Sequence, residues 1–207
     1  MAEHDKYIGN KTNLFETLEY LQANNINPVS REDEIWKRYG DQASILKLDS
    51  VGFTRITKEF GIVYFLSRVI EMRSLVLPIL KHNGCLSNQM KSDSVFAFFE
   101  TPAQSLKAAI EANKAIKEAK LMLTEEEPFR ICIGIGFGKM LYSETLEGYY
   151  GDEMNITSKL GEDIAVGNEI LITEAAYANI TDKQKELFDK HETVISQAPA
   201  IFYRTSI

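Results

Sequence analysis

Apolar residues along this chain form short runs and helical stripes that predict strands and helices in a mixed order. The short runs have the length and flanking turns of strands, and they cover 43–49, 85–90, 94–99, 129–137 and 169–172. The stripes at helical spacing cover 54–81, 102–123 and 152–165. This order, βαββαβ with extra elements, predicts an α+β fold with a ferredoxin-like core sheet. The tail at 192–205 is expected to add one or two strands.

Two of the predicted strands carry informative faces. In the run 94–99, apolar residues fill both sides, which is expected of a strand in the centre of a sheet. In the run 129–137, isoleucines alternate with Cys132, Gly134 and Gly136. A face of such small residues predicts that a helix or a ligand approaches the backbone closely.

The stripe 54–81 is the longest predicted helix, and it contains Pro78. Proline lacks a backbone N–H and clashes with the preceding turn, so it is expected to kink or end the helix. The pair Thr101-Pro102 is a strong start for the next helix, because proline suits the first helical position.

The first part of the chain, 1–41, predicts two helices ahead of the first strand. Thr12 or Asn13 can cap the first helix, and Ser30 can cap the second. We therefore divide the chain into an N-terminal helical extension, 1–41, and a main domain, 42–207. The two helices are expected to cover a sheet edge or to form a dimer arm, and docking of a regulatory protein partner is a further possibility.

Composition and charge narrow the class of protein. A chain of 207 residues that is 44% hydrophobic suits a globular domain with a full core. The net charge of −7 and the lack of a basic stripe disfavour nucleic acids and anionic membranes as partners. No apolar run approaches the ~20 residues that span a bilayer, and no secretory signal is visible. Cys85 and Cys132 are expected to be buried free thiols, so a cytoplasmic location is predicted.

The stretch that most strongly indicates a functional site reads Ile45-Leu-Lys-Leu-Asp-Ser-Val-Gly-Phe-Thr54. An apolar strand delivers Asp49 at its end, a tight turn follows, and a helix begins. The turn leaves backbone N–H groups without helical partners, and these groups suit the oxygens of a polyphosphate. The residues that would supply them are Val51, Gly52, Phe53 and Thr54. An ordinary strand-to-helix turn with a solvated Asp is the alternative.

A second carboxylate, Asp93, is expected to lie beside Asp49. In the predicted topology the first and third strands are antiparallel neighbours, so the end of one meets the start of the other. Two like charges this close need a cation between them. Oxygen ligands without a nearby His or Cys favour Mg²⁺ or Mn²⁺. The alternative is that both residues are separate turn or cap residues.

Three stretches together resemble the catalytic domain of the class III adenylate and guanylate cyclases, over roughly 43–180. That family carries Asp-Ile-x-Gly-Phe-Thr, then Lys-x-x-Gly-Asp before an apolar strand, then Gly-x-x-x-Asn-x-x-x-Arg. The first pattern matches the stretch quoted above. The other two match Lys91-Ser-Asp-Ser-Val-Phe-Ala-Phe-Phe99 and Tyr149-Tyr-Gly-Asp-Glu-Met-Asn-Ile-Thr-Ser-Lys-Leu160.

The resemblance implies an activity and a metal requirement. Asp49 and Asp93 match the residues that hold two metal ions per site in the family. The implied reaction is attack of the ribose 3′-hydroxyl of a nucleoside triphosphate on its α-phosphate, with release of pyrophosphate. Asn155 matches the residue that orients the ribose, and Lys159 stands where the family has the Arg that stabilises the transition state. Lys keeps the charge but loses the bidentate fork, and a solvated surface lysine is the alternative.

The base-reading positions depart from the family. Gln89 replaces the adenine-reading Lys, and Gly148 replaces its partner, so the rule for adenine cannot be carried over. Lys91 shares a strand face with Gln89 and is a candidate for a base or phosphate contact. In addition, Ser92 replaces the glycine that precedes the second metal-binding Asp.

The resemblance also implies a head-to-tail homodimer, because the family builds each site from two subunits and both halves are present here. Three functions remain open at this point. The first is a nucleotidyl cyclase, with ATP as the default substrate. The second is a pyrimidine cyclase that uses UTP or CTP. The third is a catalytically degenerate cyclase-homology dimer that acts as a nucleotide-binding or regulatory protein.

Overall fold

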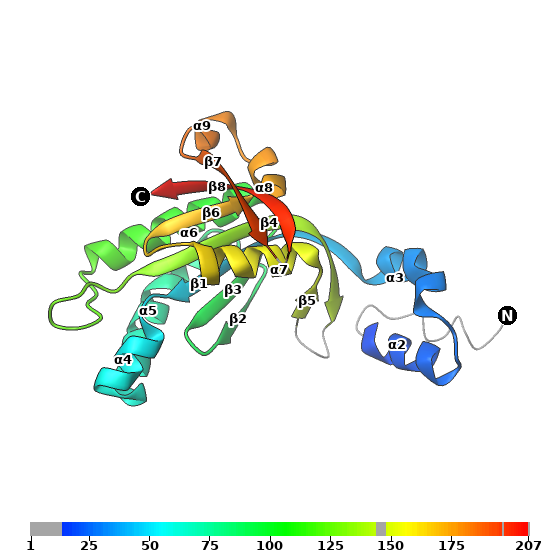
Figure 1. Ribbon diagram of the computed structural model, residues 1–207, viewed down its shortest axis with the longest axis horizontal. Coiled ribbons are helices and arrows are strands. Elements are labelled where there is room, and N and C mark those ends of the chain that lie inside the picture. Colours follow the sequence, from blue (N-terminus) through cyan, green and yellow to red (C-terminus); the bar gives the residue numbers. More distant parts are fainter. Residues whose placement is uncertain (1–13, 144–147, 196, 207) are drawn as a thin grey trace. The chain divides into compact units, whose positions relative to one another are not determined.

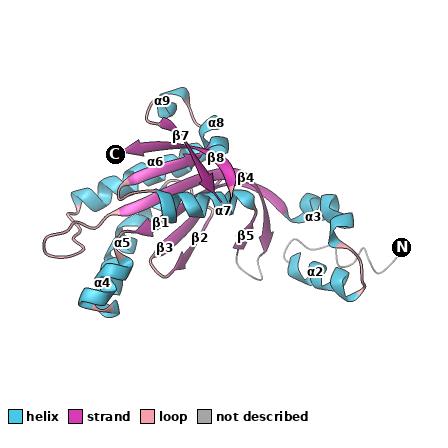
Figure 2. Cartoon of the chain, viewed as in Figure 1, coloured by secondary structure: helices cyan, strands magenta, loops and turns pink. Residues whose placement is uncertain are grey.

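The computed structural model describes residues 14–143, 148–195 and 197–206. An eight-stranded sheet runs in the order β2-β3-β1-β4-β6-β8-β7, with β5 paired to β4 (Figures 1 and 2). The strands are β1 (Gly40–Ser50), β2 (Ser87–Lys91), β3 (Ser94–Phe99), β4 (Ile131–Ser143), β5 (Gly148–Tyr150), β6 (Glu169–Thr173), β7 (Asp189–Ile195) and β8 (Ala198–Ser206). The expected α+β fold with a ferredoxin-like core and extra C-terminal strands is therefore confirmed.

The helices complete the described elements. The α-helices are α2 (Leu14–Ala23), α3 (Glu32–Tyr39), α4 (Phe53–Phe60), α5 (Ile62–His82), α6 (Pro102–Glu118), α7 (Asp152–Lys159), α8 (Glu174–Ala178) and α9 (Asp182–Lys185). The shorter turns are the 3₁₀ turn η1 (Pro28–Arg31) and the π-helical turn η2 (Leu160–Ile164). No helix within the described ranges is long and apolar enough to cross a membrane.

The contacts divide the chain into two compact units. The smaller unit comprises residues 1–42 and 139–154, and the larger unit comprises 43–138 and 155–207. Our division of the chain into an N-terminal helical extension, 1–41, and a main domain, 42–207, stays a prediction.

The larger unit has its main core on one face of the sheet. Leu46 and Leu48 of β1, alternate residues of β3 and the isoleucines of β4 and β6 are buried there against α5 and α6. Thr101 caps α6 through a reciprocal pair of hydrogen bonds with Gln104, as its Thr-Pro start predicts. This core fixes the end of β1, where the candidate site lies.

The opposite face of the sheet is covered by α7 and η2. A Cβ atom on Gly134 would lie 2.4 Å from the Thr157 carbonyl oxygen and 2.9 Å from the Gly161 nitrogen. The prediction that the small-residue face of β4 admits a helix is therefore confirmed. Cys132 on this face is buried, as predicted, whereas Cys85 is only partly buried.

The smaller unit contains α2, η1 and α3, with a cluster formed by Leu14, Leu21, Ile35 and Tyr39. Inside the cluster, the hydroxyl groups of Thr17 and Tyr39 lie 2.7 Å apart. The predicted cap at Thr12 or Asn13 lies outside the described residues.

The predicted Ser30 cap is wrong. Asn27 caps η1 instead, through its side-chain oxygen, and α3 begins after Arg31 without a side-chain cap. The acidic first turn of α3 compensates for the missing cap, because carboxylates there interact favourably with the helix dipole.

The predicted helix 54–81 is two helices, and the break lies at Gly61 rather than at Pro78. Gly61 has a φ of 87°, which an L-residue rarely adopts, so it ends α4 and begins α5. The residues after Pro78 continue the helix to His82. Four residues from the end of a helix of 21 residues, proline removes one backbone hydrogen bond, and packing on the core holds the remaining turn in place.

Candidate functional site

The end of β1 brings Asp49 next to the start of β3. The two strands are antiparallel, with Leu48 opposite Val95. The next pairs are bonded through their side chains. The Ser94 hydroxyl donates to Asp49 Oδ1 at 2.5 Å, and the Ser50 hydroxyl donates to Asp93 Oδ2 at 2.6 Å. The structure therefore places both predicted carboxylates at the same end of neighbouring strands, and their sharing of one cation stays a prediction.

The surroundings of Asp49 perturb the pKa of its carboxyl group. Burial raises the pKa of Asp49 above its ordinary value, and the negative charge of Asp93 adds to that increase. The hydrogen bond from Ser94 and the charge of Lys47 act in the opposite direction. Like charges that interact in this way favour a cation between them.

Lys47 is the residue of this site that our sequence analysis missed. Its side chain is fully buried, and its ammonium lies 3.4 Å from Asp49 Oδ1, 3.0 Å from Ser94 Oγ and 2.5 Å from Glu162 Oε1. A buried charge needs such partners, because removal from water is costly. The signal was present in the sequence as a lysine inside the apolar run that leads to Asp49.

Glu162 reaches Lys47 from the turn η2. The turn is π-helical, and π-helical turns occur often at functional sites. It lies so close to β1 that a Cβ on Gly161 would be 3.2 Å from the Lys47 carbonyl oxygen. The ammonium is thus held between β1, β3 and η2 on the face that carries Asp49.

The turn between β1 and α4 offers fewer phosphate donors than we predicted. Gly52 has a φ of 98°, which is why glycine is needed there. The Val51 N–H already donates to the Arg130 carbonyl at 3.0 Å, so Val51 is not available as a donor for a ligand. The candidate donors that remain are Gly52, Phe53 and Thr54, at the start of α4.

Asn155 and Lys159 lie one turn apart on α7, and both side chains are exposed. Lys159 pairs with Asp163 at 2.9 Å, and this hydrogen bond raises the pKa of Lys159. The lysine is therefore charged and in contact with a carboxylate of its own helical segment. Its predicted role at the α-phosphate stays a prediction.

The predicted base-reading residues lie on two different units. Gln89 and Lys91 belong to β2, the edge strand, where Gln89 is opposite Phe96 and Lys91 is opposite Ser94. Gly148 begins β5 in the smaller unit, opposite Ser143. The shared strand face of Gln89 and Lys91 follows from their spacing, and their base contacts stay predictions.

The carboxylates keep oxygens that can bind a metal. Within the described ranges, no hydrogen bond reaches Asp49 Oδ2 or Asp93 Oδ1, and no group of three or more His, Cys, Asp or Glu side chains converges. Two free carboxylate oxygens suit a hard cation such as Mg²⁺ or Mn²⁺. The donor set therefore fits the predicted type of metal.

Comparison with known proteins identifies the fold. The chain matches no family model and no curated relative. Among solved structures, an adenylate/guanylate cyclase/hydrolase from Silicibacter pomeroyi is similar, with a TM-score of 0.69 and 18% identity over 81% of this chain and 98% of that chain.

Two further solved structures show the same similarity. An adenylate cyclase from Trypanosoma brucei in its monomeric state has a TM-score of 0.64 and 18% identity, covering 79% of this chain and 89% of that chain. The guanylate cyclase domain of RhGC from Catenaria anguillulae, in complex with GTP, has a TM-score of 0.64 and 16% identity, covering 80% and 96%. The chain thus has the fold of adenylate and guanylate cyclase catalytic domains, as the three sequence stretches predicted.

Proposed function

We propose that the protein is a nucleotidyl cyclase that converts a nucleoside triphosphate to a 3′,5′-cyclic mononucleotide and pyrophosphate. The observation that carries the proposal is the position of Asp49 and Asp93 at adjacent strand ends, beside the turn that begins α4. In a cyclase fold, this corner offers carboxylates for a cation and the N–H groups of Gly52, Phe53 and Thr54 for phosphate oxygens.

Asp49 and Asp93 would hold Mg²⁺ or Mn²⁺, two ions per site as the resemblance implies. When bound, the metal would neutralise phosphate charge and make the ribose hydroxyl more acidic. The chain contributes one cation of its own, because Lys47 already lies against Asp49 Oδ1. Asp49 Oδ2 and Asp93 Oδ1 are then the oxygens left for metal.

The second half of the site would come from a partner subunit in a head-to-tail homodimer. Asn155 would orient the ribose and Lys159 would contact the α-phosphate. An exposed apolar surface on α4 and α5 supports assembly, since such patches mark interaction sites. Its members are at least 37% exposed, and they are Phe53, Phe60, Ile62, Val63, Leu66 and Ile70.

The residues at the base-reading positions bear on the choice of substrate. ATP is the default substrate, but Gln89 and Gly148 replace the purine-reading residues, and this favours a test of UTP and CTP. Gln89 can both donate and accept hydrogen bonds, so it suits more than one base edge. Lys91, on the same strand face, is the candidate for an added phosphate or base contact.

One experiment tests the function directly. The protein is incubated with Mn²⁺ and each of the four nucleoside triphosphates, and cyclic products are sought by mass spectrometry. We expect one triphosphate to give a cyclic mononucleotide and pyrophosphate in equal amounts. Binding of nucleotide without any cyclic product would instead support the alternative, a degenerate cyclase-homology dimer with a regulatory role, which the Lys159, Gln89 and Gly148 substitutions favour.

Lys47→Met tests the metal site without using activity. Methionine fills a similar volume but removes the ammonium, so Asp49 loses its resident cation. We expect Mn²⁺ binding, measured by calorimetry, to become tighter by at least about tenfold, because a buried charge repels a nearby metal strongly. Lys58→Met, which removes the same charge from an exposed position on α4, is the control. Equal Mn²⁺ affinity in both variants and the wild type would contradict a cation at Asp49.

A further inference from the structure

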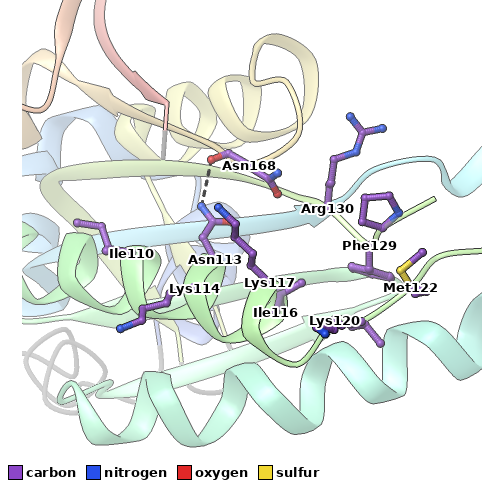
Figure 3. A pocket seen from close by; sticks show the side chains of 12 residues that line it. Ile110, Asn113, Lys114, Ile116, Lys117, Lys120, Met122, Phe129, Arg130 and Asn168 are labelled. Carbon is purple, nitrogen blue, oxygen red and sulfur yellow. Dashed lines mark hydrogen bonds between the residues drawn. The ribbon is translucent and has the colours of Figure 1, made fainter. Parts of the chain in front are cut away.

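A cavity of about 560 Å³ lies between the C-terminal part of α6 and the segment that leads into β4 (Figure 3). Its volume is within the range of small-molecule sites. The inner wall is apolar, and Ile116, Leu121 and Phe129 each remain at most 7% exposed there. The cavity lies within the larger unit, and no residue of the proposed nucleotide site lines it.

The polar lining of the cavity is cationic. Lys114, Lys117, Lys120 and Arg130 line it, and no acidic residue does. Lys114 and Arg130 have carboxylate partners, at 3.7 Å and 3.0 Å, outside the lining. Lys117 and Lys120 form no ion pair with the part of the chain that the structure describes. In a protein with a net charge of −7, this local excess of positive charge favours an anion.

Asn113 adds an unused hydrogen-bond acceptor. Its side-chain nitrogen donates to the Asn168 carbonyl at 3.1 Å, which fixes the orientation of the amide. Asn113 is only 8% exposed, and its Oδ1 atom is buried and accepts no hydrogen bond from the described residues. Figure 3 shows Lys117 extending beside Asn113 toward Asn168. Buried polar atoms are normally paired, so this acceptor calls for a donor from a ligand.

We propose that this cavity binds a small organic anion that has an apolar body and a hydrogen-bond donor. The apolar body would pack on Ile116, Leu121 and Phe129, and the anionic group would lie near Lys117. The donor would satisfy Asn113 Oδ1. This inference does not rest on the proposed cyclase activity, because it uses only the chemistry of the cavity itself.

The cavity is connected to the turn that follows β1. Arg130 lines the cavity, and its carbonyl accepts the hydrogen bond of the Val51 N–H at 3.0 Å. A ligand that immobilises Arg130 would therefore stabilise this hydrogen bond. We expect hydrogen exchange of the Val51 amide, followed by NMR, to slow when the cavity is filled. Unchanged exchange of the Val51 amide at saturating ligand would show that filling the cavity does not stabilise the turn after β1.

The binding test uses 8-anilinonaphthalene-1-sulfonate, which has an aromatic body, an N–H donor and a sulfonate. Its fluorescence on titration of the whole protein gives a dissociation constant. We expect Lys117→Glu to weaken binding at least about tenfold, because it reverses the charge beside the anion. Lys107→Glu is the matched control, since Lys107 is exposed on the same helix and does not line the cavity.

A neutral probe separates the anion site from simple apolar binding. N-phenyl-1-naphthylamine lacks the sulfonate, and its affinity is expected to be lower than that of the anionic probe and indifferent to Lys117→Glu. The proposal is overturned if Lys117→Glu and Lys107→Glu weaken the anionic probe equally, or if both probes bind wild-type protein equally well. Thermal melting of each variant shows whether a loss of binding comes from a loss of the fold.

Discussion

Asp49→Asn is expected to abolish cyclic-nucleotide formation and to weaken Mn²⁺ binding, while the fold is retained. Asn keeps the size of the side chain but lacks the charge that a divalent cation requires. The Ser94 hydroxyl can still donate to the amide oxygen, and Lys47 keeps Glu162 and Ser94 as partners. Burial raises the pKa of Asp49, so the ionised carboxylate is disfavoured in the folded state, and its neutral replacement is not expected to lower the melting temperature.

Product formation by mass spectrometry, Mn²⁺ binding by calorimetry and thermal melting test this expectation together. Asp189→Asn is a suitable control, because Asp189 is exposed at the start of β7. Unchanged Mn²⁺ affinity in Asp49→Asn would show that Asp49 is a turn residue and not a metal ligand.

A mixing experiment extends this test to the assembly. If the site is composite, Asp49→Asn and Asn155→Ala are each inactive alone, but a mixed dimer has one intact site. Equal mixing should then restore up to about a quarter of the wild-type activity, because half of the dimers are mixed and each has one of two sites. No recovery after subunit exchange would contradict the head-to-tail arrangement.

Lys159→Arg is expected to increase turnover by a factor on the order of 10² to 10³, the size of effect that a single well-placed transition-state donor has. Arg would supply two parallel N–H donors to the α-phosphate oxygens, which Lys cannot do. Lys159→Ala should lower turnover further with little change in nucleotide affinity, because the contact forms late in the reaction. Single-turnover rates and nucleotide dissociation constants separate the two effects.

Asp163 provides a second test of the same role. It holds Lys159 at 2.9 Å, so Asp163→Asn should free the lysine and increase turnover in the same direction as Lys159→Arg. For Lys159→Arg, the control is Lys183→Arg on α9, which shows any general effect of an added arginine. If Lys159→Ala and Lys159→Arg both match the wild type in product formation, Lys159 is a surface residue and the assigned role is wrong.

The sheet could be predicted because its strands carry strong local signals. The residues of β3 are apolar on both faces, and the small residues of β4 mark the close approach of a helix. The pairing of β2 with β3 and of β1 with β3 therefore followed from pattern and topology. The single helix expected from the stripe 54–81 is in fact two helices that separate at Gly61, because the apolar spacing does not record the backbone conformation that breaks them.

The positions of the two carboxylates could be predicted because each stands at a strand end, whereas the buried lysine between them and η2 was missed because it lies inside a strand. Asp49 and Asp93 stand next to turn signals, so their meeting follows from the antiparallel pairing of β1 and β3. Lys47 lies within an apolar run, and its partners Ser94 and Glu162 come from distant segments that only the tertiary structure brings together. The engaged N–H of Val51 was missed for the same reason, since Arg130 is far away in the sequence.

The contact between Gly134 and Gly161 limits how this protein can evolve. Each glycine faces the backbone of the other segment, so neither position tolerates even one added methyl group unless η2 moves away from the sheet. Because Glu162 follows Gly161 directly, that movement would also withdraw the carboxylate from Lys47. A substitution at either glycine is therefore expected to weaken the Lys47–Glu162 ion pair, although neither glycine takes part in it.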